Sequence, residues 1–366
     1  MMKIKHTVCP SCSLGCGINL ITLNEEVVGT YPYKRHEFNE GKNCLKGRNC
    51  YKLTDENRIE TPLIKKGTQN KAEWDEALDL ISSEMKSCDV DDIGILVSGT
   101  CTNEVCELSK KFADAMGISN IGFSVENSQD LKNENVSFDD LENSDVIVLF
   151  GDILKENPLM GRRVILAQDK GVKIISLDSN DSSNTSLIAD EYIKTDSFKN
   201  FLDNDSTLAE QLSDSSTVII RSMNSSEDLN AVQELTSKAG SNLITILNEC
   251  NSLGAIEYLT PLDQNEVQDL IESVKLLYVI GGNPATYAEE SLKKINFLIT
   301  EGYELNQTVL MSNVALPSTC WAEADGSFKN TMGKLQKFAK VVEPPENSRD
   351  DETIIKEIAE KMGITL

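Results

Sequence analysis

Short runs of β-branched and aliphatic residues recur along most of the chain and alternate with amphipathic stretches. Each run is long enough for a buried strand and too short for most helices. The alternation favours α/β layers around mostly parallel sheets, and the number of runs suggests two such units. The predicted strands cover residues 93–98, 145–150, 172–177, 217–222, 242–247, 276–281 and 308–313.

The stretches between these runs carry apolar residues at helical spacing. The clearest of them repeats with a period of 3.6 residues on one face, at Trp74, Ala77, Leu78, Ile81 and Met85. We expect this helix to begin at Asn70, because Glu73 follows three residues later as in a capping box. Further helices are predicted at 103–116, 161–169, 227–239, 264–274, 287–299 and 352–362.

The first 55 residues follow neither pattern. They contain both histidines and short β-like runs at 18–23 and 26–31, and five of the ten cysteines lie before position 51. We therefore predict a small β-rich domain at residues 1–57 that is stabilised by bound metal. A discontinuous α/β domain would follow at 58–129 and 256–366, with a second α/β domain inserted at 130–255.

Charge and length narrow the class of protein. The 366 residues carry 35 basic and 59 acidic side chains, a net charge of −24, which repels phosphate backbones and argues against nucleic acid or anionic membrane as a partner. No apolar run approaches the ~18 residues that span a membrane, so membrane insertion is not expected. The N-terminus lacks an export signal. The expected location is the cytoplasm, where clustered cysteines indicate metal binding rather than disulfides.

Cys9, Cys12 and Cys16 form a C-x2-C-x3-C motif, and Cys44 follows further along the chain. Three thiolates on one glycine-containing loop and a fourth from a returning segment can surround a 4Fe-4S cluster. Structural zinc also takes four cysteines, although zinc ribbons usually pair two C-x2-C motifs. Zinc and free thiols stay open as alternatives, and Cys50 is a spare ligand.

The remaining cysteines, the histidines and the glycine-rich loops give little indication of other catalytic or nucleotide-binding sites. The five remaining cysteines are scattered singly and are expected to be small buried hydrophobes. Only Cys101 is expected to be reactive, because it follows a strand at the start of a helix, where a thiol pKa can be lowered. Both histidines lie in the cysteine-rich segment, so no Ser/His/Asp triad can be argued, and nicotinamide and ATP loops are absent.

Eight segments suggest a family. VCPSCSLGCGINL (8–20), EGKNCLKGRNCY (40–51), RIETPLIKK (58–66) and WDEALDLI (74–81) open the chain. CTNEVCELSKKFADAMGISNI (101–121), GDILKENPLMGRRV (151–164), LYVIGGNPA (277–285) and LPSTCWAEADGSFKNTMGKLQ (316–336) follow. In this order they resemble molybdopterin oxidoreductases, most closely the catalytic alpha subunit of formate dehydrogenases. The resemblance implies a small β-rich 4Fe-4S N-terminal domain, followed by two Rossmann-like, mostly parallel α/β domains.

The resemblance also implies roles for individual residues. Cys9, Cys12, Cys16 and Cys44 would hold the 4Fe-4S cluster. Lys46 would lie in the electron path between cluster and pterin, unless it is only a solvated surface lysine. A molybdopterin guanine dinucleotide carrying Mo or W would lie on the strand-end loops 151–157 and 281–284. The implied pterin contacts are Gly151, Asn157, Asp178, Gly281, Asn283 and Asn330, with Glu323 in the same closing motif as Asn330.

Three departures from the family pattern matter. Ser128 stands at the position of the metal-ligating cysteine or selenocysteine, Gln129 replaces the catalytic histidine, and Glu126 replaces an arginine. Asp178 is followed by Ser-Asn rather than the family's Pro-Arg. The sequence ends just after the helix that closes the second α/β unit, so the family's C-terminal pterin-binding domain is expected on another chain.

These features favour an iron–sulfur protein that passes electrons within a larger oxidoreductase complex. The expected partners are other redox subunits, of iron–sulfur or flavin beta type, and a separate C-terminal pterin domain. One alternative is a catalytically competent Mo/W bis-pterin subunit of the formate or formylmethanofuran dehydrogenase type. Arg162, Arg163 and Lys334 would then balance the charge of the pterins. The other alternative is a non-redox structural scaffold.

Overall fold

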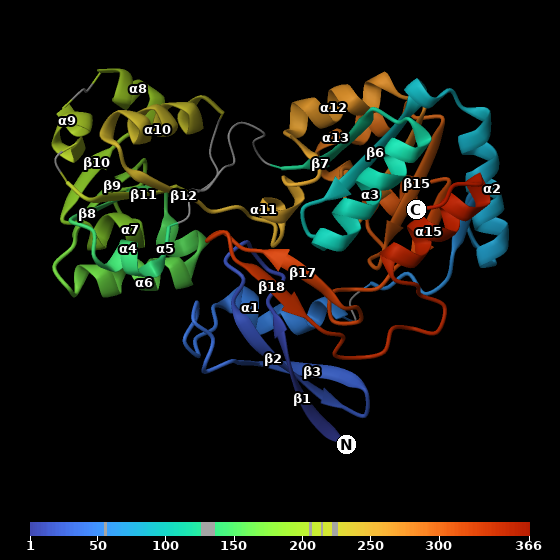
Figure 1. Cartoon of the computed structure of the whole chain (residues 1–366), viewed down its shortest axis with the longest axis horizontal. Coiled ribbons are helices and arrows are strands. Elements are labelled where there is room, and N and C mark those ends of the chain that lie inside the picture. The colour runs from blue at the N-terminus through green and yellow to red at the C-terminus, as the bar shows by residue number, and fades with distance from the viewer. Residues whose placement is uncertain (55–56, 126–135, 205–206, 214, 222–225) are drawn as a thin grey trace.

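The computed structural model describes residues 1–54, 57–125, 136–204, 207–213, 215–221 and 226–366. Two α/β parts occupy the two ends of the long axis, and a small antiparallel sheet lies below the region between them (Figure 1). The predicted fold class is confirmed: a small β-rich N-terminal part precedes two mostly parallel α/β sheets. The boundaries given above for the domains stay a prediction.

The N-terminal sheet contains β1 (Met2–Val8), β2 (Gly17–Leu23) and β3 (Glu26–Pro32) in that order. β1 and β2 pair antiparallel until Val8 faces Gly17, so residues 9–16 form the connection of a hairpin. Two short helices follow, α1 (Leu45–Asn49) and the 3-10 helix η1 (Cys50–Thr54).

The larger sheet has the strand order β13-β7-β6-β14-β15-β16-β4-β5 and is parallel except at its β16-β4-β5 edge. Ile93, Ile95 and Val97 of β6 pack with α2, α3 and α15, whereas Leu96 packs on the opposite face with α12 and α13. This alternation fixes which helices cover each face. The strands are β4 (Leu63–Lys66), β5 (Thr68–Lys71), β6 (Ile93–Ser98), β7 (Asn120–Ser124), β13 (Thr260–Leu262), β14 (Leu276–Ile280), β15 (Phe297–Gly302) and β16 (Val314–Pro317). The helices are α2 (Trp74–Ser87), η2 (Val90–Asp92), α3 (Asn103–Met116), α11 (Ser252–Ala255), α12 (Gln264–Ser273), α13 (Ala285–Leu292), α14 (Gln307–Met311) and α15 (Asp351–Met362).

The second α/β part is a five-stranded parallel sheet in the order β10-β9-β8-β11-β12. Its strands are β8 (Val146–Phe150), β9 (Lys173–Asp178), β10 (Glu191–Lys194), β11 (Thr217–Arg221) and β12 (Asn242–Thr245). Its helices are α4 (Phe138–Glu142), α5 (Ile153–Glu156), α6 (Pro158–Gln168), α7 (Asn184–Ile188), α8 (Phe198–Asn204), α9 (Thr207–Ser213) and α10 (Ser226–Ala239). A separate hairpin of β17 (Gly326–Lys329) and β18 (Leu335–Phe338) lies between the N-terminal sheet and the α/β parts (Figure 1).

Three predicted elements were wrong. The stretch 308–313, predicted as a strand, lies mostly in helix α14, and the strand β16 begins only at Val314. The predicted helix 287–299 ends at Leu292, and β15 begins at Phe297. The first helix begins at Trp74 rather than Asn70, because residues 68–71 pair as the edge strand β5. Within the described residues, no helix has both the length and the apolar character needed to cross a membrane.

Candidate functional site

The three N-terminal cysteines lie on the connection between β1 and β2. The Cys9 amide donates to the Cys16 carbonyl at 2.8 Å, which closes the loop at its base. Cys9 and Cys16 are buried and Cys12 is partly buried. The loop therefore brings three thiols from a short segment to one side of the N-terminal sheet.

Distant segments fix the shape of this loop. Gly15 has φ +67°, and a Cβ there would lie only 2.0 Å from Oε1 of Gln336, so glycine is required. The Gln336 side chain donates to the Gly15 carbonyl at 2.8 Å, and the Thr331 amide donates to the Ser13 carbonyl at 2.7 Å. The Ser13 hydroxyl accepts from the Leu247 amide at 3.0 Å. The sequence analysis missed this clamp, because its partners lie far away along the chain.

Cys44 is the N-cap of α1 and approaches the loop from the other side. Its sulfur accepts from the Gly47 amide at 3.4 Å. A Cβ on Gly47 would lie 3.4 Å from the Cys9 sulfur and 3.8 Å from the Cys44 sulfur. Position 47 therefore lies against both sulfurs, which places Cys9 and Cys44 on the same side of the α1 turn. The donor set fits an iron–sulfur cluster.

The thiols influence one another electrostatically. Burial, assisted by the charges of Cys9 and Cys44, raises the pKa of Cys12 to about 12, while Lys46 opposes this shift. Burial and the other three thiols raise the pKa of Cys16. The four sulfurs are therefore close enough for their charges to interact. Within the described part of the chain, no three Cys, His, Asp or Glu side chains form a site tight enough for a single metal ion. The four cysteines stay predicted ligands.

Cys50 lies beside this group. Its buried thiol donates to the Gly47 carbonyl at 3.2 Å, and a hydrogen bond from it lowers the pKa of Cys9 to about 7. The sulfur that caps α1 belongs to Cys44, whereas the Cys50 thiol is engaged with the backbone and with Cys9. This arrangement favours Cys44 as the fourth ligand.

Replacing Cys44 or Cys50 by serine tests which of the two is the fourth ligand of the cluster. We expect Cys44→Ser to lower the bound iron from about four atoms per chain to a smaller or absent cluster. Cys50→Ser should keep the iron, because it removes only a hydrogen-bond donor. Iron and sulfide analysis of anaerobically purified protein measures both. If Cys44→Ser keeps its iron and Cys50→Ser loses it, then Cys50 and not Cys44 is the fourth ligand.

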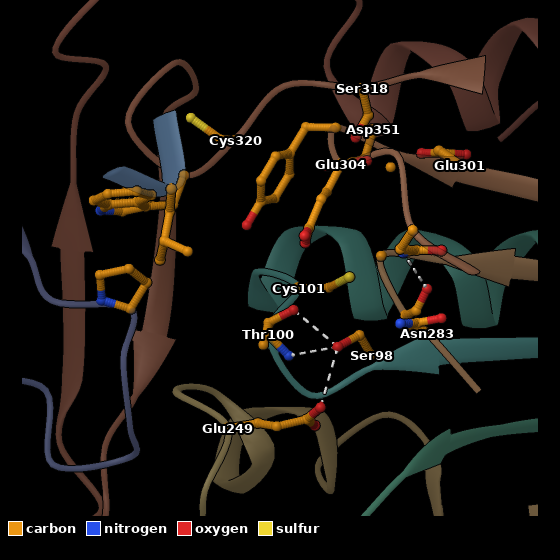
Figure 2. A pocket seen from close by; sticks show the side chains of 18 of the residues that line it. Ser98, Thr100, Cys101, Glu249, Asn283, Glu301, Glu304, Ser318, Cys320 and Asp351 are labelled. Carbon is orange, nitrogen blue, oxygen red and sulfur yellow. Dashed lines mark hydrogen bonds between the residues drawn. The ribbon is translucent and has the colours of Figure 1, made fainter. Parts of the chain in front are cut away.

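A cavity of about 480 Å³ lies at the carboxyl ends of the central strands of the larger sheet. Two of the predicted pterin contacts, Gly281 and Asn283, line this cavity. Ser98, Thr100 and Cys101 line it as well. Figure 2 shows Glu249, Glu304, Glu301 and Asp351 around this space. Its lining in the described residues contains these four carboxyl groups and no lysine, arginine or histidine.

Two of the carboxyl groups, the buried Glu301 and the partly buried Asp351, lie next to each other. Glu301, at 2% exposure, accepts a hydrogen bond from the Tyr278 hydroxyl. Burial and the nearby Asp351 charge raise the pKa of Glu301 well above its usual range, and burial also raises the pKa of Asp351. The pair therefore favours holding a proton rather than two negative charges.

Most backbone amides of the first predicted pterin loop, and the Gly281 amide of the second, donate to groups of the protein. In the first loop the amides of residues 151 and 153–157 all donate to groups of the protein, including the Thr185 hydroxyl, which accepts from Leu154 at 3.0 Å. In the second loop the Gly281 amide donates to the Glu301 carbonyl at 2.8 Å. The Asn283 Oδ1 atom accepts from the Thr308 amide and hydroxyl.

The other predicted pterin contacts lie elsewhere. Asn157 and Asp178 are buried in the second α/β part, and the Asp178 Oδ2 atom has no hydrogen-bond partner. The side-chain oxygen of the fully buried Asn330 accepts from the Met332 and Lys334 amides in the turn that clamps the cysteine loop. The structure thus does not bring all six residues to one cavity, and their pterin roles stay predictions.

The proposed balancing cations are engaged in ion pairs. Arg162 pairs with Glu40 at 2.9 Å, and Arg163 pairs with Glu40 at 3.0 Å and Glu142 at 3.2 Å. Lys334 pairs with Glu37. These contacts join the N-terminal part to α6 and to the β17–β18 turn. None of the three cations lines the cavity.

Two further predictions have different outcomes. Cys101 was expected to have a lowered pKa, but burial raises it well above the usual value, and its sulfur contacts the Ile280 carbonyl at 3.6 Å. A raised pKa favours the protonated thiol, so the expected lowering of the Cys101 pKa is not found, although Cys101 is only partly buried. Ser128, with Gln129 and Glu126, lies outside the described residues. Glu249 was missed altogether, since nothing in its local sequence links it to Ser98.

Comparisons with known proteins agree with this architecture. A model of the family described as "Molybdopterin oxidoreductase" matches residues 58–361, and one described as "Molybdopterin oxidoreductase Fe4S4 domain" matches residues 2–56. The F420-dependent formate dehydrogenase 1 subunit alpha of Methanococcus maripaludis is 28% identical, over 98% of this chain and 70% of that protein. Formate dehydrogenase H of Escherichia coli is 24% identical, over 99% and 68%. Acetylene hydratase from Pelobacter acetylenicus shares the fold, with a TM-score of 0.74, 15% identity, and coverage of 98% of this chain and 69% of that one.

Proposed function

The chain belongs to the molybdopterin oxidoreductase family, and from that premise we propose that it relays electrons within a larger, formate-dehydrogenase-like complex. The relay is a 4Fe-4S cluster, bound by Cys9, Cys12, Cys16 and Cys44. When bound, such a cluster accepts and releases single electrons at a potential set by nearby charges and hydrogen bonds. The relatives named as alpha subunits support an assembly of several chains.

One observation carries the proposal most strongly: three thiols share one hairpin connection, and a fourth caps the helix beside it. The sulfurs of Cys9 and Cys44 both border the space left by the absent side chain of Gly47. Cys9 and Cys16 are buried, and Cys12 and Cys44 are partly buried, so the thiols are partly shielded from water. Shielding favours a cluster that exchanges electrons without losing iron.

Protein purified anaerobically from its own host tests the proposal. We expect about four iron atoms per chain and a centre that becomes EPR-active on reduction. Stoichiometric zinc, or a cluster that no partner subunit can reduce, would defeat it. A partner that co-purifies and reduces the centre would identify the electron donor.

Lys46 allows the electrostatic part of the relay to be measured. Its exposed ammonium lies near enough to Cys12 to oppose the rise of that thiol's pKa. Loss of the cation should make the cluster harder to reduce, so Lys46→Ala should lower its potential by roughly 20–60 mV. A redox titration followed by EPR gives the shift.

Two variants make this measurement specific. Lys46→Arg keeps the charge and should keep the potential. Lys52→Ala removes another exposed cation from the neighbouring 3-10 helix and is the matched control. Equal potentials in Lys46→Ala and the wild-type protein would leave Lys46 as a surface residue.

The catalytic alternative is favoured by one feature, the cavity at the carboxyl ends of parallel strands, where such sheets bind ligands. Family membership also suggests a pterin cofactor. Molybdenum or tungsten at one atom per chain in the purified protein would establish this alternative in place of the relay alone.

A further inference from the structure

The segment after β12 crosses the turn between β6 and α3. The Asn251 amide donates to the Gly99 carbonyl at 2.8 Å, and its side chain donates to the Cys101 carbonyl at 2.8 Å. The Cys250 thiol approaches the Thr100 carbonyl at 3.8 Å. Another part of the chain thus contacts the backbone carbonyls of residues 99–101 in the strand-end turn.

Glu249 places its carboxylate directly against this turn. The Ser98 hydroxyl donates to Oε1 of Glu249 at 3.4 Å, and the Thr100 amide donates to the Ser98 oxygen at 3.2 Å (Figure 2). A Cβ on Gly99 would lie only 2.3 Å from Oε2 of Glu249. The carboxylate therefore fills the space beside Gly99.

This position is the usual anion position of a parallel α/β sheet. β6 is a central strand, and α3 begins just after the turn, with Thr102 as its N-cap. Phosphate groups bind at such turns because the helix N-terminus carries partial positive charge. A protein carboxylate at the same place uses that charge and repels a second anion.

The described side chains of the rest of the cavity offer a pyrophosphate no positive charge. Its described lining holds three further carboxyl groups and no basic side chain. The Gly281 amide is committed to the Glu301 carbonyl, and the basic residues Arg162, Arg163 and Lys334 are paired with acids elsewhere. A dinucleotide would bring two negative charges into this environment.

We infer that Glu249 is an internal anion that takes the phosphate position at the β6–α3 turn, so that this cavity excludes pyrophosphate-bearing dinucleotides. The residues present therefore do not fit the pterin dinucleotide that family membership suggests. The inference goes beyond the electron relay and does not depend on it.

Calorimetric titration of the full chain with inorganic pyrophosphate and with GDP tests the inference at low salt. The wild-type protein should show no saturable binding of either probe. Glu249→Gln keeps an acceptor for Ser98 but removes the charge, so it should bind pyrophosphate saturably, at least tenfold more tightly than the weakest affinity that the titration can detect. Glu346→Gln removes an exposed carboxylate outside the cavity and should behave as the wild type.

Two results would overturn the inference. One is saturable binding of either probe by the wild-type protein, or pterin released from it at one or more per chain. The other is a Glu249→Gln variant that, like the wild type and Glu346→Gln, shows no saturable binding of pyrophosphate. Glu249→Asp, which keeps the charge, provides a second variant: it should still exclude pyrophosphate if charge is decisive. Iron content and EPR, measured on the same samples, report on the relay separately.

Discussion

Replacing Cys16 by serine should remove most of the iron from the protein and several kcal/mol from its stability. Cys16 is buried, ends the cysteine loop and accepts the Cys9 amide through its carbonyl. Loss of one thiolate weakens the binding of a cluster that needs four ligands. Because the free energy of cluster binding contributes to the stability of the folded protein, that contribution is then lost. Iron analysis should fall from about four atoms to below about one per chain. Thermal unfolding of the same sample measures the loss of stability.

Cys88→Ser is the matched control for this exchange. Cys88 is a partly exposed cysteine that packs with the core of the larger sheet, away from the cysteine loop. The Cys88→Ser variant should bind as much iron as the wild type, and its free energy of unfolding should be nearly unchanged. If Cys16→Ser instead retains the iron and the EPR signal of the wild type, Cys16 is not a ligand and the proposed cluster site fails.

Arg58→Ala should cost about 3–5 kcal/mol of unfolding free energy. Arg58 and Glu323 form an ion pair of 2.8 Å whose side chains are only 7% and 5% exposed. Glu323 also accepts the Cys320 amide at 2.9 Å, so loss of the arginine leaves a buried, fixed carboxylate without its counter-charge. Chemical denaturation followed by circular dichroism gives the change.

Two comparisons isolate the cause of this loss. The exposed pair Lys3–Glu25 spans 2.7 Å, with side chains 48% and 64% exposed, and Lys3→Ala should leave the free energy of unfolding nearly unchanged. The double variant Arg58→Met with Glu323→Gln should recover part of the loss, because no charge is left buried. A cost below about 1 kcal/mol for Arg58→Ala would mean that water or another cation compensates Glu323.

Local sequence was sufficient to predict the strands that lie inside a sheet. Runs such as 93–98 and 145–150 are buried on both faces, and their composition alone marks them. The same rule was wrong for 308–313, where the Asn306 side chain caps a short helix by accepting the Val309 amide at 3.0 Å. A short apolar run is compatible with either structure, and the cap decided between them.

The cysteine pattern could be recognised from the sequence because its spacing is local. The lining of the cavity could not be predicted in this way, because its residues come from distant parts of the chain. Ser98 and Glu249 are 151 positions apart, and nothing in the local sequence of either residue indicates that they form a hydrogen bond. Likewise, the lowered pKa predicted at Cys101 assumed a helix start without tertiary contacts, whereas Asn251 from the crossing segment donates to the Cys101 carbonyl. Tertiary contacts of this range leave no periodic signal.

The clamp on the cysteine loop has a consequence for biosynthesis. Gly15 is held by Gln336, 321 positions later, and Ser13 by Thr331 and Leu247. While the ribosome is still making the middle of the protein, the emerging thiols have no fixed arrangement. Iron delivery that depends on this arrangement must therefore wait until nearly the whole polypeptide has been translated.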